Sequence, residues 1–300
     1  MRRLTKGTGR SVQTMIQAAR GRSLWDDART RLLRNKAAVT GMTVLAALAV
    51  AAILGPLVAP FAHDEISKAE VWLPPLTDGH LLGTDALGRD LFSRLLMGLR
   101  VSLAIGLVAT AVSLAIGVAW GATAGFVGGR TDETMMRVVD VLYSLPFIFF
   151  VILLMVTFGS NLVLMFVAIG AVEWLTMSRI VRGQTLTLKQ KEFVEAARAA
   201  GLTGGQIVAR HIVPNLLGPV AVYVTLTIPA VILAESFLSF LGLGVQPPMA
   251  SLGGLIADGA QQMELAPWLL IFPGVAMVAT LMSFNFIGDG LRDALDPKDR

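Results

Sequence analysis

The chain has 300 residues, of which 54% are apolar and 15% are charged, and it carries a formal net charge of +4. About a quarter of the residues in a soluble domain are charged, so this composition excludes an ordinary soluble domain and indicates a membrane protein. Cysteine is absent, the three histidines lie far apart, and the patterns HExxH, GxSxG and GxxxxGK[ST] do not occur, so no catalytic residue, metal site or nucleotide-binding loop is predicted in this chain.

Residues 1–36 form a polar, basic segment ahead of the first apolar stretch. Ser23 and Asp26 have the spacing of a helix capping box. Leucine and alanine then recur at helical intervals among basic residues, which predicts an amphipathic helix on the cytoplasmic membrane surface. A solvated basic tail is the alternative interpretation.

Six segments are apolar over the length that a membrane-spanning helix needs, which is about 20 residues. They predict an all-α integral membrane protein with spans at 37–60, 101–126, 138–158, 162–177, 216–238 and 267–287. The first span is long enough to cross the bilayer and follows a long polar segment, so we interpret it as an uncleaved anchor.

The distribution of basic residues predicts the orientation of the spans. Of the 25 lysine and arginine residues, 21 lie in segments on the same side as the two termini. Translocation of such residues is disfavoured, so both termini are expected in the cytoplasm and the loops 61–98 and 239–266 outside. This bias accounts for the pI of about 9.8 without a nucleic-acid partner.

The cytoplasmic loop 179–215 is too long for a simple connector. Thr187 is expected to cap a helix that continues through Ala200 and ends at Gly201. Thr203 then has capping-box spacing and is expected to begin a second short helix, which Pro214 ends. From the residues alone, this hairpin could pack on its own bundle or present a surface to a partner.

Parts of this loop resemble the EAA loop of importer-type ABC permeases, namely Glu195-Ala-Ala197, Gly201 and Pro214. His211 and Val213 depart from the general pattern of that family and are similar to its peptide- and nickel-importing branch. From about Ser23 to its last residue the chain resembles the permeases of oligopeptide ABC importers. Further segments that carry the resemblance are Gly83-Thr-Asp85, Gly88-Arg-Asp90, Ser144-Leu-Pro146, Arg182-Gly183, Glu235 to Gly242 and Gly288 to Pro297.

The resemblance implies the type I ABC importer permease fold in the bacterial inner membrane, with the transmembrane domain at 99–290 and a cytoplasmic tail at 288–300. It implies a related second permease as heterodimer partner, two ATPase subunits that bind ATP and Mg, and an extracytoplasmic oligopeptide-binding protein, with no cofactor in this chain. It also implies a set of residues that couple to the ATPases: Glu192, Glu195, Ala196, Ala197, Ala200, Gly201, Leu202, His211 and Pro214.

Carboxylates inside spans are costly and are therefore candidates for a functional role. Asp140 is expected to pair with Arg137, and Glu173 fits either a structural hydrogen bond or a place on the transport pathway. Glu235, with Ser236 and Ser239 in the segment that follows it, is our candidate for lining the pathway.

The residues are also compatible with other functions. A secondary transporter driven by protons or sodium would use Asp140, Glu173 or Glu235 as its coupling site. Permeases of the same ABC family also import dipeptides or nickel. A structural scaffold fits the composition, whereas an intramembrane enzyme would need a catalytic constellation that we do not find.

Overall fold

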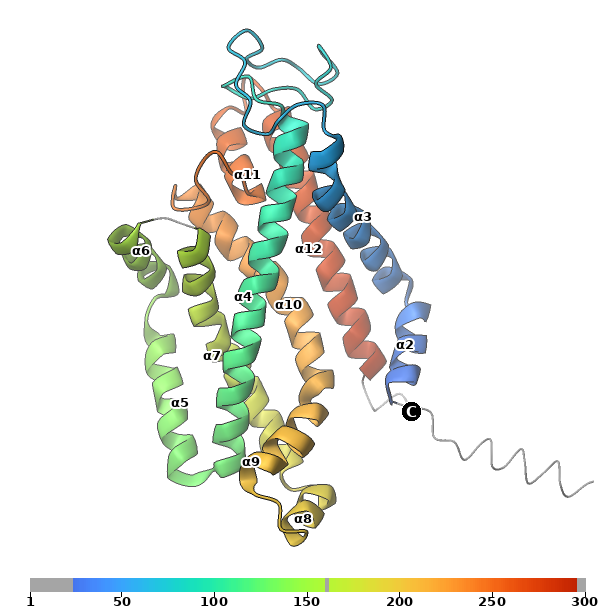
Figure 1. Ribbon diagram of the computed structural model, residues 1–300, viewed down its shortest axis with the longest axis vertical. Helices are drawn as coiled ribbons and strands as arrows, with labels where there is room; N and C mark the ends of the chain where they lie inside the picture. The colour runs from blue at the N-terminus through green and yellow to red at the C-terminus, as the bar shows by residue number, and fades with distance from the viewer. Residues whose placement is uncertain (1–23, 160–161, 296–300) are drawn as a thin grey trace, which may run out of the picture.

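The computed structural model describes residues 24–159 and 162–295, and its regular elements are helices that form an elongated bundle (Figure 1). The long helices are α3 (Lys36–Val58), α4 (Leu91–Val127), α7 (Leu162–Leu188), α10 (Val213–Phe240) and α12 (Trp268–Leu295). The shorter ones are α2 (Leu24–Arg34), α5 (Gly129–Ser144), α6 (Phe147–Phe158), α8 (Glu192–Ala199), α9 (Gly204–Ile207), the π-helix η1 (Val208–Ile212) and α11 (Leu252–Gln261). The predicted capping serine, Ser23, lies outside the described residues.

The described residues contain five helical stretches long and apolar enough to cross a membrane, or six if the bent pair α5 and α6 counts as one span. The predicted all-α membrane fold is therefore confirmed. Several helices are longer than the apolar segments that predicted them: α4 begins at Leu91, α7 continues to Leu188 and α12 to Leu295. A polar cap begins α4, where the Asp90 carboxylate accepts the Ser93 backbone N–H at 2.7 Å.

The third predicted span, 138–158, is not one straight helix. α5 and α6 are inclined to each other by 79°. Leu145 between them is extended, with φ −74° and ψ 133°, which is the conformation that a residue before proline prefers. Pro146 therefore ends α5 and sends the chain in a new direction.

α4 and α7 approach each other closely through glycines on one face of α4. A Cβ atom at Gly117 would lie 2.5 Å from Met177 Cγ, and one at Gly121 would overlap the Ser178 carbonyl oxygen. A Cβ at Gly125, one turn further on, would lie 2.9 Å from the Arg182 carbonyl oxygen. Small residues at intervals of four allow this kind of helix packing in membranes.

The chain between α3 and α4 folds into an ordered cap at one end of the bundle (Figure 1). Buried His80 contacts Asp90 through Nδ1 and Oδ1 at 2.9 Å. Asp85 accepts backbone N–H groups from Leu87 and Arg89 at 2.8 and 3.0 Å. The acidic residues of the Gly83 to Asp90 segment thus stabilise turns and the start of α4.

α11 was not predicted, because 239–266 was expected to be only a loop. Ser251 caps it by accepting the Gly254 N–H at 3.0 Å, and α11 packs against α4, α10 and α12. A Cβ at Gly253 would overlap Ser236 of α10. Glycine has a low helix propensity, so the sequence of this segment did not predict a helix. The close packing that glycine permits stabilises the helix in the folded chain.

α2 forms where an amphipathic helix was predicted. Its Ala28 is 4% exposed, and a Cβ at Gly290 of α12 would lie 3.2 Å from Leu32 Cδ1. Part of the apolar face therefore packs on the end of α12, while contact with the membrane surface stays a prediction.

Candidate functional site

The loop that follows α7 lies at the end of the bundle opposite the cap, with α8 projecting beyond the long helices (Figure 1). The prediction that Thr187 caps this helix is wrong. Thr187 lies in the last turn of α7 and donates to the Gly183 carbonyl at 3.4 Å. α7 thus extends beyond the apolar segment 162–177 as far as Leu188. Lys189 then ties the end of α7 to α4 by donating from Nζ to the Gly125 carbonyl at 2.9 Å.

α8 ends in a Schellman motif, which fixes the turn into α9. The Leu202 N–H donates to the Ala197 carbonyl at 3.2 Å and the Gly201 N–H to the Arg198 carbonyl at 3.0 Å. Gly201 has φ +81°, a conformation that costs glycine little and a β-branched residue much more. The predicted end of the helix at this glycine is thereby confirmed.

The predicted capping box of the second short helix is present. The Gln206 N–H donates to the Thr203 hydroxyl at 3.4 Å, and the Thr203 N–H donates to Gln206 Oε1 at 2.9 Å. The end of α8 and the start of α9 are thus both fixed by local bonds, one set on each side of the turn between them.

α8 has an inner and an outer face. Val194 and Ala197 are 0% and 6% exposed and share an apolar cluster with Val181 of α7 and Ile212 of η1. Ala197 therefore supports the loop from inside. The other predicted residues of α8 and its turn lie exposed on the outside, namely Glu192, Glu195, Ala196, Ala200 and Gly201.

Phe193 also lies on the outer face and was missed by the sequence analysis. It is 38% exposed and shares an i, i+3, i+7 stripe with Ala196 and Ala200. An exposed aromatic ring beside two methyl groups gives the projecting end of the bundle an apolar strip, with Glu192 and Glu195 on the same helix. The helical spacing from Ala196 was the signal that could have identified it.

Pro214 does not end the second helix, contrary to the prediction. α9 continues through the π-helix η1 into α10, where Pro214 occupies the first turn. The Val213 N–H bonds to the Val208 carbonyl, a five-residue step. Pro214 follows this wider turn directly, in the first turn of α10, where its missing N–H is tolerated. The helical path therefore continues past the proline.

The remaining predicted residues of the loop lie nearer the bundle. Leu202 is partly buried against the apolar cluster around Val194. His211 is partly buried in η1, and its carbonyl accepts the Asn215 side-chain amide at 2.7 Å. The structure thus brings the predicted coupling residues together in one compact loop. Ala197 and Leu202 pack against the bundle, and the outer residues of α8 are exposed.

Glu235 is 0% exposed and joins three helices. Its Oε1 accepts from the Ser239 hydroxyl at 2.6 Å, and its Oε2 lies 3.5 Å from the Ser102 hydroxyl of α4. Ser251, the cap of α11, lies 3.4 Å from Ser239. In this conformation Glu235 presents no side-chain surface to a solute. The pathway role of Glu235, Ser236 and Ser239 stays a prediction.

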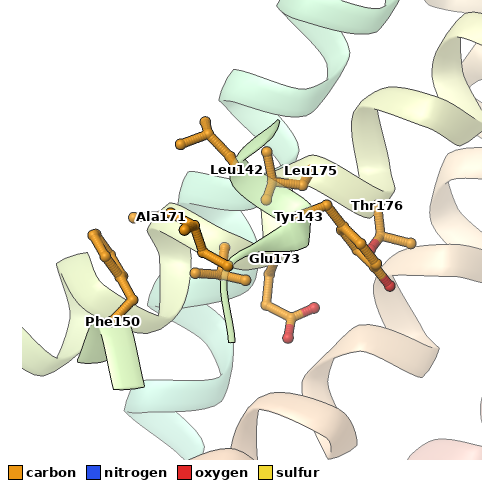
Figure 2. Close-up of a pocket in the computed structure, with 9 residues that line it drawn as sticks. Leu142, Tyr143, Phe150, Ala171, Glu173, Leu175 and Thr176 are labelled. Atoms are coloured by element: carbon orange, nitrogen blue, oxygen red, sulfur yellow. The ribbon is translucent and has the colours of Figure 1, made fainter. Parts of the chain in front are cut away.

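A cavity of about 350 Å³ lies beside the break between α5 and α6 (Figure 2). Its walls are formed by Leu142, Tyr143, Leu145, Phe150, Ala171, Val172, Glu173, Leu175 and Thr176. Among the described residues that line it, Glu173 is the only acidic or basic one, and Figure 2 shows its carboxylate together with Tyr143 and Thr176.

The expected pair of Asp140 with Arg137 is wrong. Asp140 Oδ1 instead accepts from Arg179 Nη2 at 2.7 Å, and the Arg179 guanidinium lies 4.4 Å from the centre of the Tyr143 ring. The packing of α5 against α7 brings together residues that are remote in the chain, which local spacing cannot show. Among the described residues, we find no cluster of three or more histidines and carboxylates that could bind a metal ion.

Comparison with known proteins places the chain among transport permeases. Residues 113–300 match the family of binding-protein-dependent transport system inner membrane components, and residues 23–75 match the N-terminal transmembrane domain of oligopeptide transport permease C. The Escherichia coli K12 oligopeptide transport system permease protein OppC is 55% identical over 93% of both chains. The Bacillus subtilis dipeptide transport system permease protein DppC is 46% identical over 93% of this chain and 87% of its own.

Among solved structures, the fold is similar to a chain of the MetNI methionine ABC transporter in an inward-facing conformation, with a TM-score of 0.55. The match covers 67% of this chain and 96% of the MetNI chain at 20% sequence identity. This likeness establishes the type of transmembrane fold.

Proposed function

Because the chain belongs to the family of binding-protein-dependent transport permeases, we propose that it is one permease subunit of an ATP-driven importer for oligopeptides in the bacterial inner membrane. It would form half of the translocation pathway. The match of residues 23–75 to the N-terminal domain of oligopeptide transport permease C, and the 55% identity to an OppC protein over 93% of the chain, support this assignment. We assign no ATP hydrolysis to this chain, because ATP and Mg would bind to separate subunits.

The proposed partners are an OppB-like second permease, OppD- and OppF-like ATPases, and an OppA-like binding protein outside the membrane. The basic residues concentrated on the side of the termini support an orientation with both termini and α8 in the cytoplasm. The ordered cap around His80 would then face the binding protein.

The two faces of α8 are the observation that carries the coupling proposal. Val194 and Ala197 hold α8 to the bundle, while Phe193, Ala196 and Ala200 form an exposed strip. α8 is connected to α7 on one side and, through α9 and η1, to α10 on the other. Movement of ATPase subunits against this strip would therefore turn both spans together, as in known rigid-body switches.

Gly201→Val tests this proposal. The φ of +81° at Gly201 is unfavourable for a β-branched residue, so the turn after α8 should shift and the exposed strip should be misplaced. We expect the assembled complex to form but to lose most binding-protein-stimulated ATP hydrolysis and peptide uptake. Gly183→Ala is the control, because a Cβ there meets no atom within 4 Å. Uptake by Gly201→Val at the wild-type rate would refute the coupling role.

Two further functions can be compared with this one. The similarity to a dipeptide permease makes dipeptides the competing substrate class, with nickel as the other solute of the resembling branch. Uptake assays with oligopeptides, dipeptides and nickel, each with its binding protein, would separate them. Uptake that needs an ion gradient and no ATP would instead favour a secondary transporter.

A further inference from the structure

The break between α5 and α6 creates the cavity beside Glu173. α5 ends at Ser144 because Leu145 precedes proline, and α6 leaves at 79°. A straight helix would have kept its side chains alongside α7 at this level. The Ser144-Leu145-Pro146 segment thus opens a space of about 350 Å³ next to the carboxylate, within the range of about 300–1,000 Å³ for small-molecule sites.

Glu173 has no cationic partner among the described residues. None of the ion pairs among the described residues includes Glu173, and Arg179, the next basic residue of α7, pairs with Asp140. A carboxylate in a membrane span is costly unless a cation, hydrogen bonds or water compensate it. Its surroundings are suited to a polar guest, because the hydroxyl-bearing side chains of Tyr143 and Thr176 line the same cavity.

The chemistry of the cavity indicates which part of a peptide it fits. A pathway for peptides of many sequences can recognise only the groups that all of them share, which are the backbone and the two termini. A free α-amino group has a pKa of about 7.7–8.0 and is mostly positive near neutral pH. An ammonium group donates three hydrogen bonds, so one carboxylate with adjacent hydroxyl oxygens complements it.

We propose that Glu173 binds the amino-terminal ammonium group of a peptide in transit, in the cavity that the α5–α6 break opens. The hydroxyl groups of Tyr143 and Thr176 in the cavity wall supply further acceptors and donors. This inference rests on the proposed import of peptides.

The test uses the complete importer in liposomes and two forms of one pentapeptide, with a free or an acetylated amino terminus. Peptide concentrations are set so that the binding protein is equally occupied by both, and peptide accumulated per ATP hydrolysed is measured. We expect wild type to favour the free form by about tenfold, the effect of one charge-assisted hydrogen bond. Glu173→Gln should lose that preference while it keeps stimulated ATP hydrolysis, and Glu173→Asp should retain part of it.

Glu133→Gln is the matched control, because Glu133 is an exposed acid at the far end of α5. The proposal is overturned if Glu173→Gln keeps the preference, or if wild type transports both forms equally. It is also overturned if Glu173→Gln slows both peptides alike and releases the second permease, since Glu173 would then pair with a base of that subunit. If wild type accumulates neither peptide with ATP, the proposed function itself fails.

Discussion

At the scale of single residues, an ion pair between Asp132 of α5 and Arg182 of α7 holds the bent pair to the bundle. It is bidentate, with Nε–Oδ1 and Nη2–Oδ2 distances of 2.5 and 2.7 Å. The side chain of Asp132 is 12% exposed, whereas the Asp140 side chain in the neighbouring pair with Arg179 is 62% exposed. Burial makes the loss of a partner more costly in the first pair.

Asp132→Asn should therefore lower the free energy of unfolding by about 1–2 kcal/mol, and Asp140→Asn by about 0–0.5 kcal/mol because exposed pairs contribute little. Thermal unfolding of the purified chain in mild detergent would measure both variants against wild type. A larger loss in Asp140→Asn than in Asp132→Asn would contradict this ranking.

The sequence predicted single residues well where the determinant is local. The Thr203 capping box and the stop at Gly201 need only neighbours within a few positions, and both are present. The partner of Asp140 lies 39 residues away, so no local spacing could identify it. Glu235 was recognised as unusual, but its burial among serines from three helices depends on packing that the sequence does not show.

At the scale of helices, the contact between α4 and α7 determines how the loop around α8 is carried. Gly121→Val would place side-chain atoms against the backbone of α7 at Ser178, which cannot move aside as a side chain can. We expect a loss of about 1–3 kcal/mol of stability, as for overpacked cores. Thermal unfolding in detergent checks it, with Gly183→Ala as the uncrowded control; equal stability of the two variants would contradict the close packing.

Helix existence was easier to predict than helix ends or breaks. The long apolar segments correspond to α3, α4, α7, α10 and α12. The sequence did not reveal α11, whose Gly253 packs against α10 and whose Gly259 packs against α12, nor the passage of a helix through Pro214 by way of η1. Each of these depends on tertiary contacts or backbone geometry that overrides local propensity.

At the scale of the whole molecule, the chain has an ordered cap at one end and α8 at the other, joined by long helices (Figure 1). Composition and basic residues predicted the membrane class and an orientation, and the resemblance supplied the fold. The cavity beside Glu173 could not be predicted, because it arises from the angle between α5 and α6. In the proposed importer, the cap would contact the binding protein and α8 would contact an ATPase subunit.

The central claim is that the outer face of α8 contacts an ATPase subunit, and the absence of cysteine makes a direct test possible. Ala196→Cys and Ala197→Cys each introduce a single thiol at neighbouring positions of the same helix turn, about 100° apart around the axis, one exposed and one 6% exposed. We predict that the thiol of Ala196→Cys reacts with a maleimide in the isolated chain, is protected in the assembled importer and cross-links to an ATPase subunit. The buried thiol of Ala197→Cys should neither react with the maleimide nor cross-link. Undiminished labelling at position 196 in an importer that retains its ATPases would contradict the account.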